Sequence, residues 1–583
     1  MIASQPQARP MTCRLLTDFA DVQVLASEWK RLWEANPDRE VFGGFRWIES
    51  WWQAYGGAAQ LLTPAVFQDG TCVGILPLVV HERTLRFVGY PATDYNDLLC
   101  EPANKADVLR AAIAALDDSP IPWEIGRLDD VPESSLLAAA RNELPPGLRG
   151  RTGLTFSALC PTVLLDEGRA ESLKSIVTKT TVSQSIRKFE KIGTLTFRHL
   201  EDREEARGHL PSFYHQHIRC RALAGVRSQC LDQSGRDLFA ALVENLDPRT
   251  DLRFSVLALD DRPIAYNFGF QLDGKFVLYS PTFDIEYFDL SPGQVLLRHL
   301  FLYAQDHGIR EFDFTVGDEA YKSRYANHTR RNFALTLYPR TPKGRITHVG
   351  HAAQALLRSR PSLYRAAKTT IAAVQGAASR VTRILRRDGL ARVASTSAVR
   401  LFRSAIYARD EVLVFTLKAP DKPTEMRGLT FREGSLSDLA DAVTTFPDYL
   451  GDSTLHDLRK RLKQGHKPFV VLDNDNVVHI VWYRVDDRLA TAELGWDFAF
   501  MFGRPTGIMY DARTPLAARG KGVYPIALSL LAQQVAKDGY EPIGYVQTDN
   551  IASRRGSEKL GMVLRGRMIR RVWFHWIRRC ETR

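Results

Sequence analysis

The residues best arranged for chemistry form a glycine-rich loop, Arg519-Gly520-Lys521-Gly522-Val523-Tyr524, between an expected strand and an expected helix. Glycines let several backbone N–H groups point into one concavity, and the start of a helix adds further unpaired N–H groups. This arrangement suits an anion such as a pyrophosphate. The loop is not a Walker sequence, because residue 515 is Pro and Lys521 is followed by Gly. Taken alone, it is equally well explained as an ordinary connection between a strand and a helix.

A second polar segment follows after one more expected strand, and it begins another helix. It reads Asp549-Asn550-Ile551-Ala552-Ser553-Arg554-Arg555-Gly556-Ser557-Glu558-Lys559-Leu560-Gly561. The order strand, Arg-Gly-Lys-Gly, helix, strand, Asn-x-x-Ser and Glu-Lys-Leu-Gly closely resembles the GNAT superfamily of N-acetyltransferases. The resemblance covers most of residues 426–583, and it implies acetyl-CoA or another acyl-CoA as cosubstrate.

The same resemblance implies which residues hold the cosubstrate. The amides around the loop would bind the pyrophosphate, the strand before it would pair with the pantetheine amides, and the later Asn and Ser would contact the cofactor arm. These cofactor residues are Arg513, Thr514, Arg519, Gly520, Lys521, Gly522, Val523, Tyr524, Asn550 and Ser553.

Two positions depart from the family pattern. Tyr524 stands where the family prefers Gly or Ala, and Ser557 stands where it often has the Tyr that protonates the leaving thiolate. A Ser hydroxyl is a poor acid at neutral pH, so that role is vacant, filled by water, or taken by Tyr545 or Tyr524. Glu493, on an earlier expected strand, is a candidate general base acting through water; a solvated strand carboxylate explains it equally well.

Residues 10–340 carry a second resemblance, made of short segments in a fixed order. They are Trp29-x-x-Leu32, Phe45-x-Trp47-x-x-x-Trp51-Trp52, Gly74-Ile75-Leu76-Pro77-Leu78, Asp94-Tyr95-Asn96-Asp97, Pro263-Ile264-Ala265, Ser291-Pro292-Gly293 and Phe312-Asp313-Phe314-x-x-Gly317-x-Glu319-x-Tyr321-Lys322. Together they look like the CelD/BioF2-like acetyltransferases found with bacterial exopolysaccharide and cellulose genes, which are relatives of the FemAB peptidyltransferases. The resemblance implies two GNAT-like halves packed together.

Within this region, Ser291-Pro292-Gly293 precedes a helix and repeats the logic of the anion-binding loop. It is the expected counterpart of the acyl-CoA loop in the second half. Asp313, Glu319 and Tyr321 follow an expected strand, where acid and base groups are usefully placed. Either carboxylate could accept a proton and the phenol could donate one. The alternative is a structural ion-pair network.

The segment Asp94–Asp97 also has two interpretations. Its acids could line an acceptor cleft between the halves, or they could cap a turn. The sequence does not choose between them.

Hydrophobic periodicity supplies the elements that must position these groups. We expect strand pairs at 64–67 with 73–78, 253–259 with 263–268 and 469–472 with 477–483, single strands at 276–279, 311–314, 508–510 and 543–547, and helices at 179–191, 522–537 and 551–560. The pattern of hairpin, strand, glycine loop, helix and strand occurs around 253–314 and again around 469–547, which suggests two related units.

These features predict an α/β fold with mixed sheets, built as tandem GNAT-like units. The predicted domains are 1–165 and 166–340 as the two halves of the first unit, 341–425 as a basic helical connector, and 426–583 as a C-terminal GNAT domain.

The net charge of the chain, +11, is concentrated in the connector. Residues 341–409 contain 14 basic residues and one acidic residue, a net +13, so the remainder sums to −2. Three roles are open: a solvated helical spacer, a contact with anionic membrane or a polysaccharide synthase, and a site for an acidic carrier or nucleotide-sugar. Few aromatic residues accompany the charge, so nucleic acid is not expected as a partner.

Several other classes of function are disfavoured by the sequence. The seven cysteines are dispersed and form no CxxC pair, and His215-x-His217 lacks a third ligand, so no metal site is expected. No apolar run is long enough for a signal peptide or a membrane-spanning helix, which favours a cytoplasmic protein, with the connector allowing peripheral contact with the inner membrane.

The predicted function is acyl-CoA-dependent N- or O-acyl transfer, acetyl in the first instance, to a sugar or a small metabolite. Two alternatives stay open: a Fem-like ligase that uses aminoacyl-tRNA, and a fusion in which one GNAT unit only binds acyl-CoA. The acceptor and the oligomeric state are not indicated.

Overall fold

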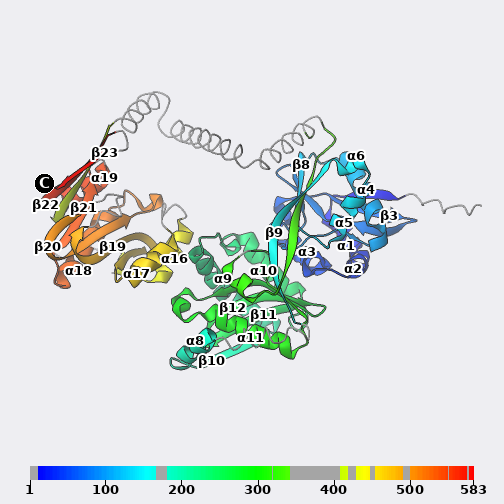
Figure 1. Cartoon of the computed structure of the whole chain (residues 1–583), viewed down its shortest axis with the longest axis horizontal. Helices are drawn as coiled ribbons and strands as arrows, with labels where there is room; N and C mark the ends of the chain where they lie inside the picture. The colour runs from blue at the N-terminus through cyan, green and yellow to red at the C-terminus, as the bar shows by residue number, and fades with distance from the viewer. Residues whose placement is uncertain are drawn as a thin grey trace, which may run out of the picture. The chain divides into compact units, whose positions relative to one another are not determined.

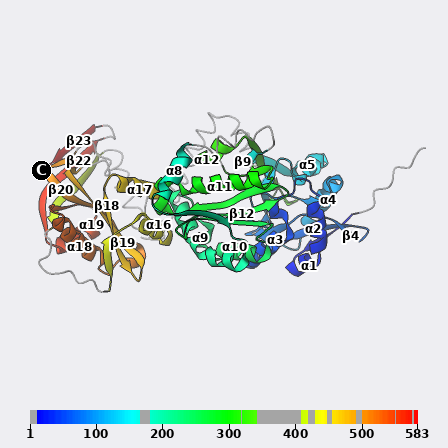
Figure 2. The same ribbon diagram turned by 90° about the horizontal axis from the view of Figure 1, so that it is seen from below.

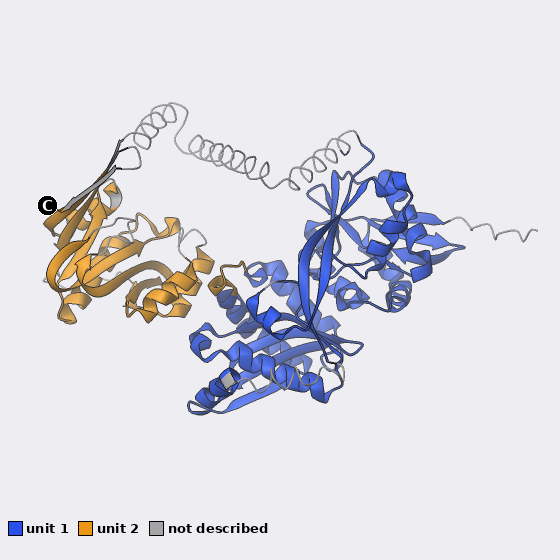
Figure 3. Cartoon of the chain, in the orientation of Figure 1, with its two compact units in different colours: residues 1–220, 228–359 blue, residues 221–227, 360–583 orange. Residues whose placement is uncertain are grey.

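The computed structural model describes residues 11–165, 180–317, 319–341, 344, 407–417, 428–446, 454–489, 499–548, 550–573 and 577–582. The chain divides into two compact units, shown in Figure 3. Unit 1 contains residues 1–220 and 228–359, and unit 2 contains residues 221–227 and 360–583. Each unit is described by itself. Within the described residues, no helix is both long and apolar enough to cross a membrane.

Unit 1 contains two β-sheets. Its strands are β1 (Thr12–Leu16), β2 (Gln60–Leu61), β3 (Thr63–Gln68), β4 (Thr71–Ile75), β5 (Leu78–His81), β6 (Thr84–Phe87), β7 (Leu99–Cys100), β8 (Ile125–Pro132), β9 (Thr152–Leu164), β10 (Leu195–His199), β11 (Leu252–Leu259), β12 (Arg262–Leu272), β13 (Lys275–Phe283), β14 (Glu311–Asp313) and β15 (His328–Leu337). The smaller sheet has the order β1-β3-β4-β7, and the larger has the order β10-β11-β12-β13-β14-β9-β15-β8-β6-β5-β2. The larger sheet therefore runs through both predicted halves without a break.

The helices of unit 1 cover these sheets (Figures 1 and 2). They are α1 (Phe19–Val24), α2 (Ala26–Glu34), α3 (Phe45–Tyr55), α4 (Lys105–Asp117), α5 (Leu136–Glu143), α6 (Pro146–Arg149), α8 (Thr180–Glu190), α9 (Arg203–Leu223), α10 (Gln233–Asn245), α11 (Pro292–Asp306) and α12 (Ala320–Tyr325). Helix α11 packs on β12 and β13, where Leu296 and Leu300 face Phe276 and Phe312 in one core.

A second core joins the two halves of unit 1. Trp29, Trp47 and Trp51 of the first half are almost fully buried, and they share one hydrophobic cluster with Phe254 and Phe268 of the second half. The expected tryptophan face of the N-terminal helices is therefore core. Burial of this much aromatic surface holds the halves together as one unit.

Unit 2 is built on a single sheet of mixed direction. Its strands are β16 (Tyr407–Leu417), β17 (Thr430–Glu433), β18 (Lys467–Asp473), β19 (Asn476–Leu489), β20 (Phe500–Arg513), β21 (Pro542–Gln547), β22 (Met562–Trp573) and β23 (Ile577–Thr582). Its helices are α16 (Leu436–Thr445), α17 (Leu455–Lys463), α18 (Val523–Lys537) and α19 (Ile551–Lys559). The order in the sheet is β17-β18-β19-β20-β21-β16-β22-β23.

The two units repeat one topology. In unit 1 the order β10-β11-β12-β13-β14-β9-β15 matches β17-β18-β19-β20-β21-β16-β22 in unit 2. The directions match as well: β13 with β14 and β20 with β21 are parallel, and the other neighbours in both series are antiparallel. Helices α11 and α18 connect the two parallel pairs. This is the repeat that the sequence indicated around 253–314 and 469–547.

One strand lies on the other side of a predicted boundary. The sequence placed residues 341–425 in the connector, whereas β16 pairs with β21 on one side and β22 on the other, inside the sheet of unit 2. Val412 and Val414 are fully buried there. The rest of the connector, including the predicted membrane or synthase contact, lies almost entirely outside the described residues.

Candidate functional site

A cavity separates the two parallel strands of unit 2. The strands β20 and β21 pair at three positions, Gly507 with Pro542, Ile508 with Ile543, and Met509 with Gly544. Both strands then run on, to Arg513 and Gln547, with a cavity of about 260 Å³ between them. Its lining residues are Phe415, Leu417, Met509, Tyr510, Asp511, Ala512, Tyr524, Leu528, Gly544, Tyr545, Val546, Gln547, Asn550, Ser553 and Ser557. Backbone groups at the edge of β20 are therefore placed to pair with an extended ligand.

The glycine-rich loop lies at the start of α18, beside this cavity. Gly520 and Gly522 have φ of 79° and 78°, and Gly522 is the residue that precedes the helix. These left-handed conformations favour glycine. Among the described residues, no atom lies within 4 Å of a Cβ built at either position, so the loop is open on that side. The first N–H groups of α18 are unpaired within the helix and suit an anion.

Tyr524 projects from the first turn of α18 toward α19. A Cβ placed on Gly556 would lie 2.8 Å from its ring, so the missing side chain at 556 is what admits the phenol ring. Burial raises the pKa of Tyr524, while the hydroxyls of Ser557 and Ser553 oppose the shift. The phenol therefore lies beside Ser557, which is 1 % exposed and stands at the position where the family often carries its acidic Tyr.

Other predicted cofactor residues are engaged with neighbouring side chains. Arg513 donates to Asp511 at 2.6 Å, and the hydroxyl of Thr514 lies 2.8 Å from Nδ1 of the buried His479. Burial lowers the pKa of His479 to about 3, so this imidazole is neutral and holds Thr514 just before the loop. The backbone of this segment stays available, whereas both side chains are part of the scaffold.

The remaining loop and helix residues divide in the same way. Arg519 donates to the carbonyl of Thr514 at 3.0 Å, Lys521 is exposed, and Val523 is buried in a small core. Asn550 caps α19, because its side chain accepts from the N–H of Ser553 at 3.2 Å.

The two remaining catalytic candidates of unit 2 lie in different places. Tyr545 lines the cavity and packs on the sheet face that carries Phe500 and Phe502. Glu493 lies outside the described residues, so its predicted role as a base stays a prediction.

The second half of unit 1 repeats this arrangement around α11. Strands β13 and β14 also pair at three positions, ending at Val277 with Asp313. Ser291 precedes the helix with φ of 55°, Pro292 is its first residue, and a Cβ on Gly293 would lie 3.3 Å from Phe283. The sequence therefore identified the correct helix start.

Buried polar groups lie on the strands beneath α11. The side-chain oxygens of Asn267, Ser280 and Thr282 are buried and form no hydrogen bond among the described residues. Unsatisfied buried oxygens are rare in folded proteins, so this is where a polar ligand would gain most.

Asp313 is enclosed by hydrogen bonds and ion pairs. One carboxylate oxygen accepts from the phenol of Tyr95 at 2.9 Å and from the N–H of Thr315 at 2.8 Å, and the other accepts from Arg330. Arg330 also pairs with Glu40 at 2.7 Å. Asp313 is 0 % exposed, so its geometry agrees with the ion-pair network that the sequence left open as the alternative to catalysis.

The other two candidates after β14 are also engaged. Glu319 pairs with Lys322 at 2.9 Å, and Lys322 donates to the carbonyl of Val316 at 2.8 Å. Tyr321 packs its ring edge-on against Phe314. The three predicted residues share one neighbourhood, but Asp313 belongs to its buried side and Glu319 to its exposed side.

The segment Asp94–Asp97 serves two purposes. Asp97 accepts from the N–H groups of Leu136 and Leu137 at the start of α5, at 3.0 and 2.8 Å, so it caps a helix. Asp94 is buried between the halves. Burial and the charge of Asp130 raise its pKa to about 7, against the opposing effects of Lys322 and the hydroxyl of Thr315.

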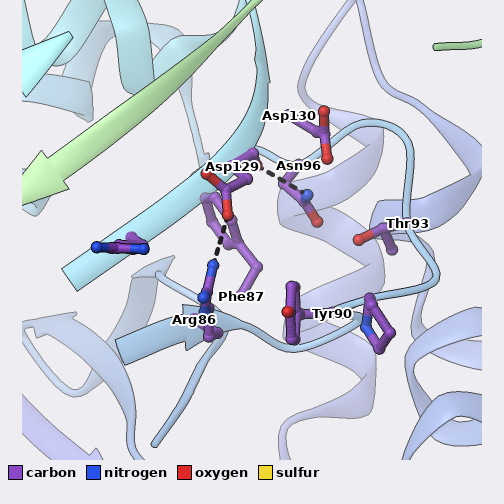
Figure 4. Close-up of a pocket in the computed structure, with 9 residues that line it drawn as sticks. Arg86, Phe87, Tyr90, Thr93, Asn96, Asp129 and Asp130 are labelled. Atoms are coloured by element: carbon purple, nitrogen blue, oxygen red, sulfur yellow. Dashed lines mark hydrogen bonds and ion pairs between the residues drawn. The ribbon is translucent and has the colours of Figure 1, made fainter. Parts of the chain in front are cut away.

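A cavity of about 220 Å³ in the first half was missed by the sequence analysis (Figure 4). It lies between β6 and β8, which are parallel and connected through α4. The lining residues are Arg86, Phe87, Tyr90, Pro91, Thr93, Asn96, Arg127, Asp129 and Asp130. The paired acids in Arg127-Leu128-Asp129-Asp130 were a visible signal, but only the parallel pairing brings them opposite Arg86.

Comparisons with known proteins agree with a transferase fold. Residues 177–323 match a family described as an acetyltransferase (GNAT) domain. A search of curated proteins finds no match. No group of His, Cys, Asp and Glu in the described part of the chain is arranged to hold a metal ion.

Solved structures with a similar fold include three transferase-type proteins. FemX is 13 % identical, covering 53 % of this chain and 95 % of its own, with a TM-score of 0.38. A tandem GNAT protein from the clavulanic acid biosynthesis pathway is 15 % identical, covering 56 % and 98 %, with a TM-score of 0.35. L-PGS from Bacillus licheniformis is 12 % identical, covering 54 % and 97 %, with a TM-score of 0.33.

Proposed function

We propose that the protein is an acyl-CoA-dependent acyltransferase that carries an acetyl group to an amine or hydroxyl of a sugar or small metabolite. The observation that carries this proposal is the cavity between β20 and β21, with the glycine loop and the start of α18 beside it. The match of residues 177–323 to an acetyltransferase (GNAT) domain supports the same class of reaction for unit 1. A link to exopolysaccharide synthesis belongs to the proposal and rests on the family resemblance alone.

The donor would lie along the edge of β20. Amides from Gly520 to Tyr524 would hold its pyrophosphate, because the left-handed glycines leave that side of the loop open. The pantetheine arm would pair with the backbone of residues 510–513, which β21 leaves uncovered. Backbone N–H groups at this edge would polarise the thioester carbonyl.

Tyr524 is the group best placed to act as the acid. In direct transfer, a neutral amine attacks the thioester carbonyl, the new C–N bond forms, and the C–S bond breaks. The amine gives up its proton to water or a base, and the thiolate takes a proton from the phenol. Because burial raises the pKa of Tyr524, the phenol holds its proton at neutral pH until the thiolate leaves.

The first experiment is calorimetric titration of the full chain with acetyl-CoA. Gly522→Asp places a carboxylate where the pyrophosphate would lie, and binding should weaken by at least about tenfold. Gly465→Asp is the matched control, since Gly465 is also left-handed, with φ of 82°, and also open on its Cβ side. Equal affinity in both variants, or no binding to the native chain, would refute the donor site in unit 2.

The same titration separates the two alternatives. If aminoacyl-tRNA supports turnover and acetyl-CoA does not, the Fem-like ligase is the correct function. If Gly522→Asp abolishes acetyl-CoA binding to unit 2 but leaves transfer unchanged, unit 2 is a binding module and the reaction belongs to unit 1.

A further inference from the structure

The cavity between β6 and β8 contains one cation and one anion that the protein does not neutralise. Arg86 donates to Asp129 at 2.6 Å, so these two charges compensate each other. The guanidinium of Arg86 also lies 4.3 Å from the ring centre of Tyr90. Arg127 and Asp130 remain. Neither forms an ion pair within the part of the chain that the structure describes.

Asp130 reaches the cavity through a local distortion of β8. Strand β15 pairs Phe333 with Val131 and Leu335 with Leu128, so Asp129 and Asp130 together oppose the single residue Ala334. This is a β-bulge, a feature often found beside functional sites. Asp130 has φ of 56°, a left-handed conformation that costs free energy in a residue with a side chain. The strain is confined to the residue that carries the unpaired carboxylate.

Oxygen atoms gather on the same side as Asp130. In Figure 4, Thr93, Asn96 and Asp130 turn oxygen atoms toward the cavity, across from Arg86. The amide nitrogen of Asn96 donates to the carbonyl of Asp129 at 3.1 Å, which leaves its oxygen as the free acceptor. The hydroxyl of Thr93 forms no hydrogen bond with any described residue. Three oxygen acceptors match the three N–H donors of a primary ammonium group.

We propose that this cavity binds a small zwitterionic amine of the amino-acid class, with its ammonium on Thr93, Asn96 and Asp130 and its carboxylate on Arg127. The volume of about 220 Å³ suits a metabolite of that size and excludes a coenzyme. Both ligand charges then meet the two charges that the protein leaves unpaired. The site lies in unit 1 and does not depend on the donor site proposed in unit 2.

Electrostatics support the ammonium side. Burial and the neighbouring Asp129 raise the pKa of Asp130 to about 6, with Asn332 opposing the shift. An ammonium at this position would favour the charged carboxylate and bring that pKa back down. The gain comes from a charge that the free protein holds at a cost.

The cavity is also tied to the second half of unit 1. The loop that forms its wall accepts a 2.7 Å hydrogen bond at the carbonyl of Ala92 from the phenol of Tyr279, on β13. Tyr95 of the same loop reaches Asp313 at 2.9 Å. A ligand in the cavity therefore contacts a loop that is fixed from behind, so the three oxygen acceptors are held in place before binding.

The test is calorimetric titration of the full chain with the common amino acids as probes. Any amino acid that binds is compared with its N-acetyl derivative and with the amine that lacks the carboxylate. We expect one or more amino acids to bind and both analogues to bind at least about tenfold more weakly, because each loses one charge-assisted contact. Binding of the N-acetyl derivative with equal affinity would overturn the ammonium assignment, and binding of no amino acid would overturn the site.

Variants locate the binding. Asp130→Asn and Arg127→Gln should each weaken the bound amino acid by about tenfold to a hundredfold. Asp107→Asn and Arg110→Gln are matched controls, because this exposed ion pair lies on α4 outside the cavity. Arg127 is exposed, so its variant keeps the test valid even if Asp130→Asn unfolds. Unchanged affinity in Arg127→Gln would overturn the carboxylate assignment. Acetyl-CoA titration of the same variants should be unchanged, which separates this result from the donor site.

Discussion

The phenol of Tyr95 donates a 2.9 Å hydrogen bond to the carboxylate of Asp313, and this contact joins the two halves of unit 1. Arg330 lies over the ring of Tyr95, 4.7 Å from its centre, while it pairs with the same carboxylate. The three side chains come from different parts of the chain and are all largely buried. The contact therefore belongs to the seam of the unit.

Asp313→Ala should destabilise unit 1 strongly. It leaves the Arg330 guanidinium buried without this partner, which costs about 3–5 kcal/mol in comparable pairs. Tyr95→Phe removes one hydrogen bond to a charged group and should cost about 1.5–3 kcal/mol. Urea unfolding followed by tryptophan fluorescence measures both. An Asp313→Ala protein with native stability but no transfer would instead establish catalysis by Asp313.

Tyr524→Phe should lower transfer while leaving the donor bound. Loss of a general acid reduces turnover by about a hundredfold or more, and the ring that packs on Gly556 is retained. The measurement is thiol release from acetyl-CoA with an acceptor found by screening amines, alongside calorimetry for binding. Tyr545→Phe tests the other candidate, and Tyr540→Phe is a control in the same core. A larger loss in Tyr545→Phe would reverse the assignment.

Asp94→Asn should change the pH dependence of stability. The pKa of Asp94 is raised from 3.8 to about 7, so between these values the folded protein binds more protons than the unfolded chain. Stability from this group therefore falls as pH rises through that window. Relative to the native protein, Asp94→Asn should gain about 2 kcal/mol between pH 5 and pH 8. Thermal unfolding across this range checks it, and parallel curves for the two proteins would contradict it.

Gly74→Ala should destabilise the smaller sheet of unit 1. A Cβ at 74 would lie 2.3 Å from a methyl carbon of Val108 on α4, so the helix must move away from the strand. Overpacking of this kind costs about 1–3 kcal/mol. Gly153→Ala is the control, because the nearest atom to its Cβ lies at 3.8 Å. Equal unfolding midpoints for the two variants would show that α4 shifts freely.

Local chemistry was sufficient to predict most of the elements. The turns Asp69-Gly70 and Asp273-Gly274 have left-handed residues in the structure, and the hairpins around them form as expected. Ser291-Pro292-Gly293 begins a helix for the same reason, since Pro suits the first turn. These signals act over a few residues, so they are legible without the rest of the fold.

The insertion of β16 and the role of Asp313 could not be predicted in this way. β16 lies in a basic region of the chain and pairs with strands that come far later, so no neighbouring residue indicates it. Asp313 looks like a catalytic carboxylate until Arg330 and Tyr95 are placed against it. Both depend on long-range contacts.

The sequence by itself determined the hairpins, the two glycine-containing helix starts and the repeated order of elements, because turn chemistry and periodicity are local. Only the tertiary structure decided what the candidate residues do. It placed Tyr524 beside Ser557, enclosed Asp313 in ion pairs, and brought Arg127 and Asp130 to one cavity. Charge and acidity depend on burial and on neighbours, and those are set by residues distant in the chain.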